Sequence, residues 1–411
     1  MCEETELIPH LFRKEFAKMV AVISKLYGLQ YIEIAEDIVS ETFLTATENW
    51  TEKGVPANPT AWLYAVAKQK TLYHFRRKNI FEEKIVPQIK VSADTISETK
   101  EMDFSTKNIK DSQLEMMFAI CDPVIASEAQ IALALRVLCG FGIEEIAEAF
   151  FSNKETINKR LFRAKEKLRA EKVQLEMPPE NEIDTRLDSV LHIIYLLFNE
   201  GYYSTTQNQI LRKDFCMEAI RLGLLLIEYS KTNLPKTNAL VALMSFHASR
   251  LDARQTADND IILYDEQDEN LWDQELIEQG TYFLNLSARG DKLTSYHLEA
   301  GIAFWNCQKE DTREKRESIL HHYNLLLEIN YSPGVALNRI YALYKARGKK
   351  IALVEAEKLN LPNNHFYFTL LGELYTSIDD KKAKENFQEA FSLAKTEKEK
   401  QSIGKRLESL L

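Results

Sequence analysis

Glycine and proline are scarce in this sequence, which has only 13 glycines and 10 prolines among 411 residues. A β-rich fold needs frequent tight turns, and these two residues supply many of them, so their scarcity argues against such a fold. Long stretches with apolar residues at helical spacing dominate instead. The sequence therefore predicts a nearly all-α protein, and its length suggests two to four domains.

Long apolar runs and clustered cysteines are also missing. No run approaches the roughly 20 apolar residues that a membrane-spanning helix needs, and the acidic N-terminus lacks the apolar core of a signal peptide. We therefore expect a cytoplasmic protein without a membrane partner. The cysteines are far apart and form no CxxC pair, which argues against a zinc site or a disulfide framework. We expect each to be a small buried apolar residue: Cys2, Cys121, Cys139, Cys216 and Cys307.

The sequence also lacks the short signatures of catalysis. It contains no HExxH metal motif, no Walker loop, no GxGxxG and no GxSxG. We therefore expect a protein that is not an enzyme and that uses no metal or other cofactor.

Positive charge is scarce overall, with a formal net charge of -10, but it is concentrated in one segment. Residues 154–172 carry eight Lys or Arg against three Glu, and their apolar residues recur on one helical face. A shorter amphipathic helix precedes them at 143–150, and Ser152 or Asn153 is placed to cap the second helix. This pattern predicts a helix-turn-helix, although a solvated charged face on an ordinary helical hairpin has the same pattern.

The first 80 residues predict three helices, at 7–27, 32–50 and 59–77, with a Gly- and Pro-containing loop at 50–59 between the last two. The third begins with Pro59 in its first turn and ends in a basic cluster. Aromatic residues lie among its basic residues, a combination that suits single-stranded nucleic acid. The alternative is that the aromatics belong to the core and the cations complement the helix C-terminus. The aromatics are Tyr64, Tyr73 and Phe75.

Composition divides the chain into four parts. We expect a helical domain at 1–84, a linker rich in Ser, Thr and charge at 85–110, a second helical domain at 111–175 and a large helical region at 176–411. The prolines at 178 and 179 mark the last boundary. Within 318–411, helix pairs with small and aromatic residues at regular spacing resemble tetratricopeptide repeats, with a non-repetitive helical bundle as the alternative.

Three stretches together resemble the extracytoplasmic-function group of RNA polymerase sigma factors, in the sigma-70 family. AEDIVSETFLTATENW is similar to the second sigma region, and NPTAWLYAVAKQKTLYHFRRK to the part that recognises and melts the −10 element. ALALRVLCGFGIEEIAEAFFSNKETINKRLFRAKEKLR is similar to the fourth region, whose helix-turn-helix reads the −35 element. LLFNEGYYST, DFCMEAIRLGLLL and SPGVALNRIYAL are similar to the subgroup with a large tetratricopeptide-like C-terminal extension.

The resemblance implies an all-α fold of two small DNA-binding domains followed by a tetratricopeptide-like regulatory domain. The implied partners are the β′ clamp helices of core polymerase, promoter DNA and an unidentified protein or peptide partner of the extension. Carried over to this sequence, polymerase binding falls on Glu36, Asp37 and Glu41. Binding of −10 DNA falls on Lys68, Lys70, Tyr73, Arg76, Arg77 and Lys78, and binding of −35 DNA on Lys154, Asn158, Lys159, Arg160, Arg163 and Lys167.

The sequence departs from the family pattern at two positions. Gln69 stands where the melting helix usually has Asn, and Tyr73 where an Asp usually precedes the basic cluster, so the −10 preference is not carried over. The resemblance implies that the extension modulates activity in cis. Its acidic stretch 258–273 is a candidate for docking on the basic surfaces, with a solvated acidic loop as the alternative. Two rival functions stay open: a helix-turn-helix regulator with a tetratricopeptide sensor, and a helical-repeat peptide-binding scaffold.

Overall fold

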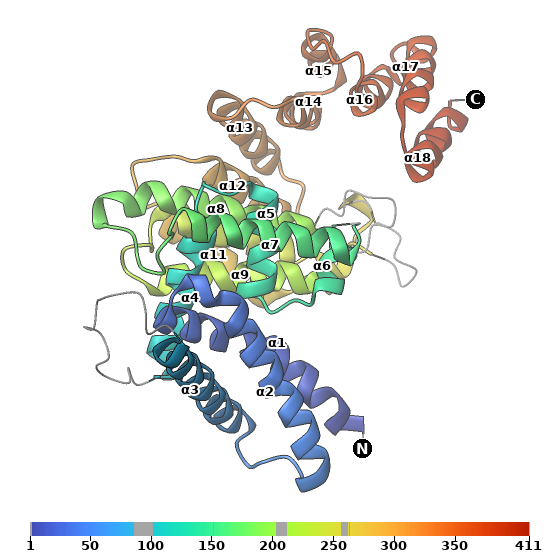
Figure 1. Cartoon of the computed structure of the whole chain (residues 1–411). Coiled ribbons are helices and arrows are strands. Elements are labelled where there is room, and N and C mark those ends of the chain that lie inside the picture. Colours follow the sequence, from blue (N-terminus) through green and yellow to red (C-terminus); the bar gives the residue numbers. More distant parts are fainter. Residues whose placement is uncertain are drawn as a thin grey trace. The chain divides into compact units, whose positions relative to one another are not determined.

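A computed structural model describes residues 2–85, 102–150, 152–202, 212–255, 262 and 264–410. Within these ranges the side chains of 2–6, 78–85, 397 and 398 are not described. All the secondary-structure elements assigned in the described ranges are helices (Figure 1). This confirms the predicted all-α class. None of the described helices is both long and apolar enough to cross a membrane.

The chain forms two compact units, which are described separately. The first comprises Met1–Glu200 and Arg221–Thr232. Its helices are α1 (Cys2–Tyr27), η1 (Leu29–Tyr31), α2 (Ile32–Lys53), α3 (Pro59–Ile85), α4 (Thr106–Ile120), α5 (Ser127–Leu133), the π-helical turn η2 (Ala134–Leu138), α6 (Ile143–Ala149), α7 (Lys154–Ala170), most of α8 (Glu180–Tyr202) and the second half of α9 (Lys213–Glu228).

The first three helices match the sequence expectation closely. Their apolar stripes meet in a core that includes Phe16, Ile23, Val39 and Leu63, none of which is exposed. Asn58 caps α3 by accepting a hydrogen bond from the backbone N–H of Ala61 at 3.0 Å. The pattern of apolar residues therefore identified the elements, and the turn residues identified where the third one begins.

The predicted domain boundaries fit less well. The helix α4 begins at Thr106, inside the predicted linker 85–110, and residues 86–101 lie outside the described part. The first compact unit also continues past residue 175 into α8 and takes in 221–232. Apolar side chains of α8 such as Leu187 and Leu191 are fully buried, so the prolines at 178 and 179 mark a break between helices rather than between compact units.

The second unit comprises Gly201–Ile220 and Asn233–Leu411. After the first half of α9, its helices are α10 (Pro235–Ala248), η3 (Leu251–Ala253), η4 (Tyr264–Glu266), η5 (Glu269–Leu271), α11 (Gln274–Ser287), α12 (Ser295–Asn306), α13 (Arg313–Ile329), α14 (Pro333–Arg347), α15 (Lys349–Ala356), α16 (His365–Tyr375), α17 (Asp380–Leu393) and α18 (Glu397–Glu408). Four of the cysteines, Cys121, Cys139, Cys216 and Cys307, are buried and form no disulfide, whereas the side chain of Cys2 is outside the described part.

Helices α16 and α17 pack closely where the sequence places small and aromatic residues together. Leu371, Tyr375 and Ala383 are buried, and the ring of Phe387 is 1% exposed. A Cβ atom added to Gly372 would lie 2.7 Å from that ring. Glycine at 372 therefore allows the two helices to approach each other at this point.

Gly372→Ala should consequently destabilise the second unit by about 1–3 kcal/mol, because the added methyl group overpacks the α16–α17 contact. Gly404→Ala is the matched control, since a Cβ at 404 would meet nothing within 4 Å, and alanine is the better helix former by about 1 kcal/mol. Urea unfolding followed by circular dichroism measures both. Equal midpoints for the two variants would contradict the close packing.

Candidate nucleic-acid interface

Helix α7 presents most of its positive charge to solvent. Its N-cap is Asn153, which accepts a hydrogen bond from the backbone N–H of Thr156 at 2.8 Å, so the cap is Asn153 rather than Ser152. Ile157 and Leu161 point into the core. The opposite face carries exposed polar and basic side chains at five of the six positions predicted for −35 DNA, namely Lys154, Asn158, Lys159, Arg163 and Lys167.

These cations are weakly engaged within the protein. Lys154 pairs with Glu144, and Lys159 Nζ lies 2.6 Å from Glu155 on its own helix. Arg160, the sixth predicted residue, is half-buried, 3.5 Å from Glu128. Exposed pairs of this kind contribute only about 0–1 kcal/mol each, so a phosphate can replace the carboxylate at little cost.

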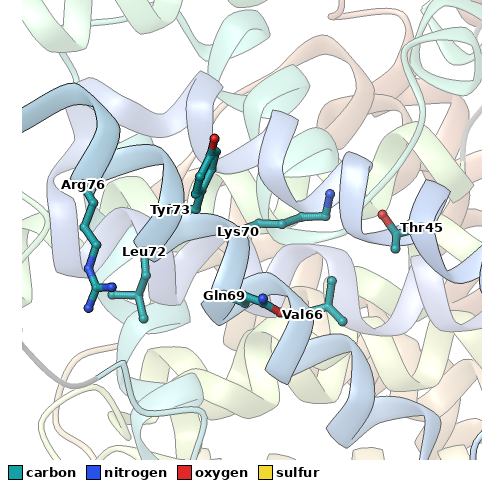
Figure 2. A pocket seen from close by; sticks show the side chains of 7 residues that line it. All are labelled: Thr45, Val66, Gln69, Lys70, Leu72, Tyr73 and Arg76. Carbon is teal, nitrogen blue, oxygen red and sulfur yellow. The ribbon is translucent and has the colours of Figure 1, made fainter. Parts of the chain in front are cut away.

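The basic helix α3 forms a second exposed surface. A pocket of about 550 Å³ opens beside it, lined by Thr45 of α2 and by Val66, Gln69, Lys70, Leu72, Tyr73 and Arg76 of α3 (Figure 2). Lys70 Nζ lies 3.5 Å from Glu41 across the two helices. Of the other predicted −10 residues, Lys68 is half-buried, Arg77 is exposed, and the side chain of Lys78 lies outside the described part.

Only one of the three aromatics predicted at this surface is exposed. Tyr73 is 67% exposed, whereas Phe75 is buried and stacks on Tyr27 with ring centroids 3.7 Å apart. Tyr64 stacks on Phe104 at 4.6 Å and donates a hydrogen bond to Glu15. The alternative in which the aromatics belong to the core therefore holds for Phe75, and Tyr64 also packs against its neighbours in the first unit, because their periodicity places them on the core side of α3.

The loop between α2 and α3 is open. Gly54 has φ +82°, the left-handed region that favours glycine, and its N–H donates to the carbonyl of Trp50 at 3.0 Å. Val55, Ala57 and Asn58 are exposed. The backbone and side chains of this loop are therefore accessible from solvent.

The three residues predicted to bind polymerase differ in their exposure to solvent. Asp37 and Glu41 are exposed on α2, but Glu36 is buried, with only 6% of its surface accessible. Its carboxylate accepts a hydrogen bond from Arg136 Nε at 2.8 Å and pairs with Lys165 of α7. In this arrangement Glu36 is not available to a protein partner, in contrast to the exposed position that the sequence suggested.

Further ion pairs join the helices α1 and α2 to the helices α4 to α7. Glu33 lies 2.6 Å from Arg169, and Lys25 lies 2.9 Å from Glu115. Arg13 pairs with Glu145 and stacks over the ring of Phe141 at 3.7 Å. The two basic helices α3 and α7 therefore belong to one compact unit in which the segments around them are in direct contact.

Arg136 and Lys165 were not singled out from the sequence. The signal for Lys165 was present, because it lies one turn after Leu161 and so falls on the buried face of α7. Arg136 sits in the π-helical turn η2, where its NH1 group also donates to the carbonyl of Phe141 at 3.1 Å. Such a turn often marks a functional position, but it is not visible in the pattern of residues.

The comparisons with known proteins agree with the geometry of the first helices. Residues 11–80 match the family described as sigma-70 region 2, and residues 186–288 match a family of unknown function (DUF6596). An uncharacterised protein of Rhizobium meliloti (strain 1021) is 30% identical over 400 residues, which cover 96% of this chain and 94% of that protein. No solved structure matches the chain.

The region 2 match assigns the N-terminal helices to the sigma-70 class, which acts in transcription initiation. The chain as a whole belongs to the same family as the full-length protein of Rhizobium meliloti. The pocket beside α3 and the basic cluster 76–78 both lie within the residues that match region 2.

Glu36→Gln should destabilise the first unit by about 3–5 kcal/mol, because removing one partner of a buried ion set leaves Arg136 and Lys165 with an uncompensated charge. Asp37→Asn, one residue along the same helix and exposed, should change the stability by less than about 0.5 kcal/mol. Urea unfolding measures both free energies. Similar values for the two variants would show that Glu36 does not hold these helices together.

Proposed function

We propose that this protein is an RNA polymerase sigma factor of the extracytoplasmic-function type. The observation that supports this most directly is the sigma-70 region 2 match over helices that carry an exposed basic pocket with a solvent-facing tyrosine. A second exposed basic helix, α7, comes later in the chain, in the order expected for region 4. The protein performs no bond chemistry in this proposal; it recruits polymerase and positions DNA.

The placement of the charges suggests the role of each residue. Lys70, Arg76 and Arg77 hold the phosphates of the −10 strand, and Tyr73 offers its ring to an unstacked base. The pair α6 and α7 acts as the helix-turn-helix, with Lys159 and Arg163 facing the major groove of the −35 element. Asp37 and Glu41 remain as the exposed carboxylates that orient α2 on the polymerase clamp.

The packed arrangement of the first unit implies that the protein must open to read a promoter. The −35 and −10 elements are on the order of 25 base pairs apart, about 85 Å of duplex at roughly 3.4 Å per base pair. In the structure, ion pairs such as Glu36–Arg136 and Glu33–Arg169 instead hold two modules in contact, the region 2 helices α1 to α3 and the segment from η2 to α7. We therefore propose that the free protein is closed and that polymerase binding separates the modules.

The C-terminal unit is proposed to be a tetratricopeptide-like regulatory extension that modulates the sigma module in cis. Its support is the close helix pairing around Gly372. Of the acidic stretch 258–273, residues 258–261 and 263 lie outside the described part. Of the rest, Trp272 is buried and most of the acidic side chains are exposed. Docking of this stretch on the basic helices stays a hypothesis.

The rival functions differ in their dependence on polymerase. A helix-turn-helix regulator would bind duplex promoter DNA alone, and a peptide-binding scaffold would bind no DNA at all. Adding the full chain to core polymerase and assaying initiation on a promoter library separates the three. Promoter-specific transcripts that require both components support the sigma factor, and binding without initiation supports the regulator.

Lys159→Ala or Arg163→Ala should weaken binding of the holoenzyme to its promoter by about 1–3 kcal/mol, in a way that depends on the −35 sequence. Lys384→Ala is the control, because Lys384 is an exposed lysine on α17 and is not among the predicted DNA-binding residues. Electrophoretic mobility assays at fixed salt measure the effect. If both α7 variants bind like the control, the proposed orientation of α7 is wrong.

Glu33→Lys should favour the open form, because it replaces the ion pair with Arg169 by two like charges. Since the pair is partly exposed, about 1 kcal/mol is expected, which corresponds to about fivefold tighter binding to core polymerase. The double variant Glu33→Lys with Arg169→Glu restores opposite charges and should return the affinity towards its original value. An unchanged affinity in the single variant would argue against the closed form.

A further inference from the structure

A buried arginine in the second unit has an unused donor in its guanidinium group. Arg250 comes directly after α10 and Ser249, and only 7% of its surface is exposed. Its Nε atom is shielded from solvent and has no hydrogen-bond partner. Among the described residues no carboxylate forms an ion pair with it. Buried charges in proteins are normally paired and hydrogen-bonded, so an unpaired buried Arg250 is suited to binding a negatively charged group.

A second buried cation lies against the same aromatic ring. The guanidinium carbon of Arg250 is 5.2 Å from the centroid of the Tyr264 ring, and Lys315 Nζ is 5.6 Å from it. Lys315 is 6% exposed. It donates to Tyr264 Oη at 3.2 Å and to the carbonyl of Gln308 at 2.8 Å. Because an ammonium group has three donors, Lys315 has one left for a further acceptor.

A third unused donor lies beside Arg250. Trp272 is 5% exposed, and its indole Nε1 is buried without a hydrogen-bond partner. Its ring stacks on Tyr264 with centroids 6.5 Å apart. The backbone N–H of Asp273 donates to the carbonyl of Ser249 at 2.8 Å, which brings Trp272 and Arg250 next to each other. Three donors from separate elements therefore surround one tyrosine.

Nearby carboxylates form their ion pairs with cations outside this cluster. The distances are 3.9 Å from Asp265 to Lys345, 3.7 Å from Glu269 to Lys309 and 2.9 Å from Asp311 to Arg316. Burial lowers the pKa of Lys315, and the charges of Asp311 and Glu269 oppose that shift without offsetting it.

The positive potential extends to His247, one turn before Arg250, at the end of α10. Burial, together with the charges of Arg250 and Arg254, lowers the pKa of His247 to about 3, so its imidazole is neutral at physiological pH. The histidine therefore adds no charge of its own to this part of the second unit.

We propose that Arg250, Lys315 and Trp272 form a binding site for one oxyanion group, the phosphate or carboxylate of a small molecule. A planar guanidinium can hold two oxygens of such a group at once, while the ammonium and the indole N–H supply single donors. Binding supplies an acceptor for the unused donor of each of the three side chains. The site belongs to the second unit alone and does not depend on the proposed sigma activity.

The test uses the full chain labelled with ¹⁵N and follows the tryptophan indole resonances while sodium phosphate or sodium acetate is added against sodium chloride of equal ionic strength. One indole resonance should shift with an oxyanion and not with chloride, and it should be missing in Trp272→Phe. The melting temperature of the second unit should rise with the same anion. A larger response to phosphate identifies a phosphorylated ligand, and a larger response to acetate identifies a carboxylate.

Arg250→Met should abolish both responses, and without added anion it should melt no lower than the unsubstituted protein, because the unpaired buried charge has been removed. Lys315→Met should weaken the responses and gives a second test should Arg250→Met fold poorly. The matched control is Lys309→Met, at an exposed lysine that pairs with Glu269 outside the cluster, and it should respond normally. Responses no larger than those to chloride, or responses that persist in both site variants, would overturn the proposal.

Discussion

The arrangement of the N-terminal unit depends on one buried carboxylate shared by two cations. Glu36 of α2 lies between Arg136 of the π-helical turn and Lys165 of α7. Taking three charges out of water is costly, and the mutual attraction of the charges offsets that cost only when all partners are present. An ion set of this kind contributes more to the choice of one arrangement than to overall stability. Here the chosen arrangement places the region 2 helices against α7.

This arrangement accounts for the position of the basic residues in an acidic chain. A chain with a net charge of -10 repels DNA as a whole, while α3 and α7 keep exposed cations whose pairs are weak enough to exchange for phosphates. Contacts such as Glu33–Arg169 use basic residues at the end of α7 to join it to α2. The same helix thus carries one set of cations that packs within the unit and another, on a different face, for which we propose DNA as the partner.

Helical periodicity and turn residues were sufficient to predict most of the fold, including the positions of α1, α2 and α3 and a capped start of α7 at Ser152 or Asn153. They were not sufficient for the site. Glu36 lies on the same helix as the exposed Asp37, and only the packing of α7 on α2 decides which of the two is buried. The sequence left the position of Tyr64 and Phe75 open, because an aromatic residue near a cation fits either a core or a DNA surface. Arg250 could not be identified at all, since an unpaired charge becomes visible only when its neighbours are known.

The central claim, that the two DNA-reading modules are packed together in the free protein and separate on polymerase, can be measured as a distance. Spin labels on Glu48→Cys of α2 and Phe162→Cys of α7 occupy exposed positions, and the four described native cysteines are buried. Pulsed electron resonance on the full chain should give a single short distance for the free protein and a much longer one in complex with core polymerase and promoter DNA. The same distance in both states, or a long distance already in the free protein, would contradict the account.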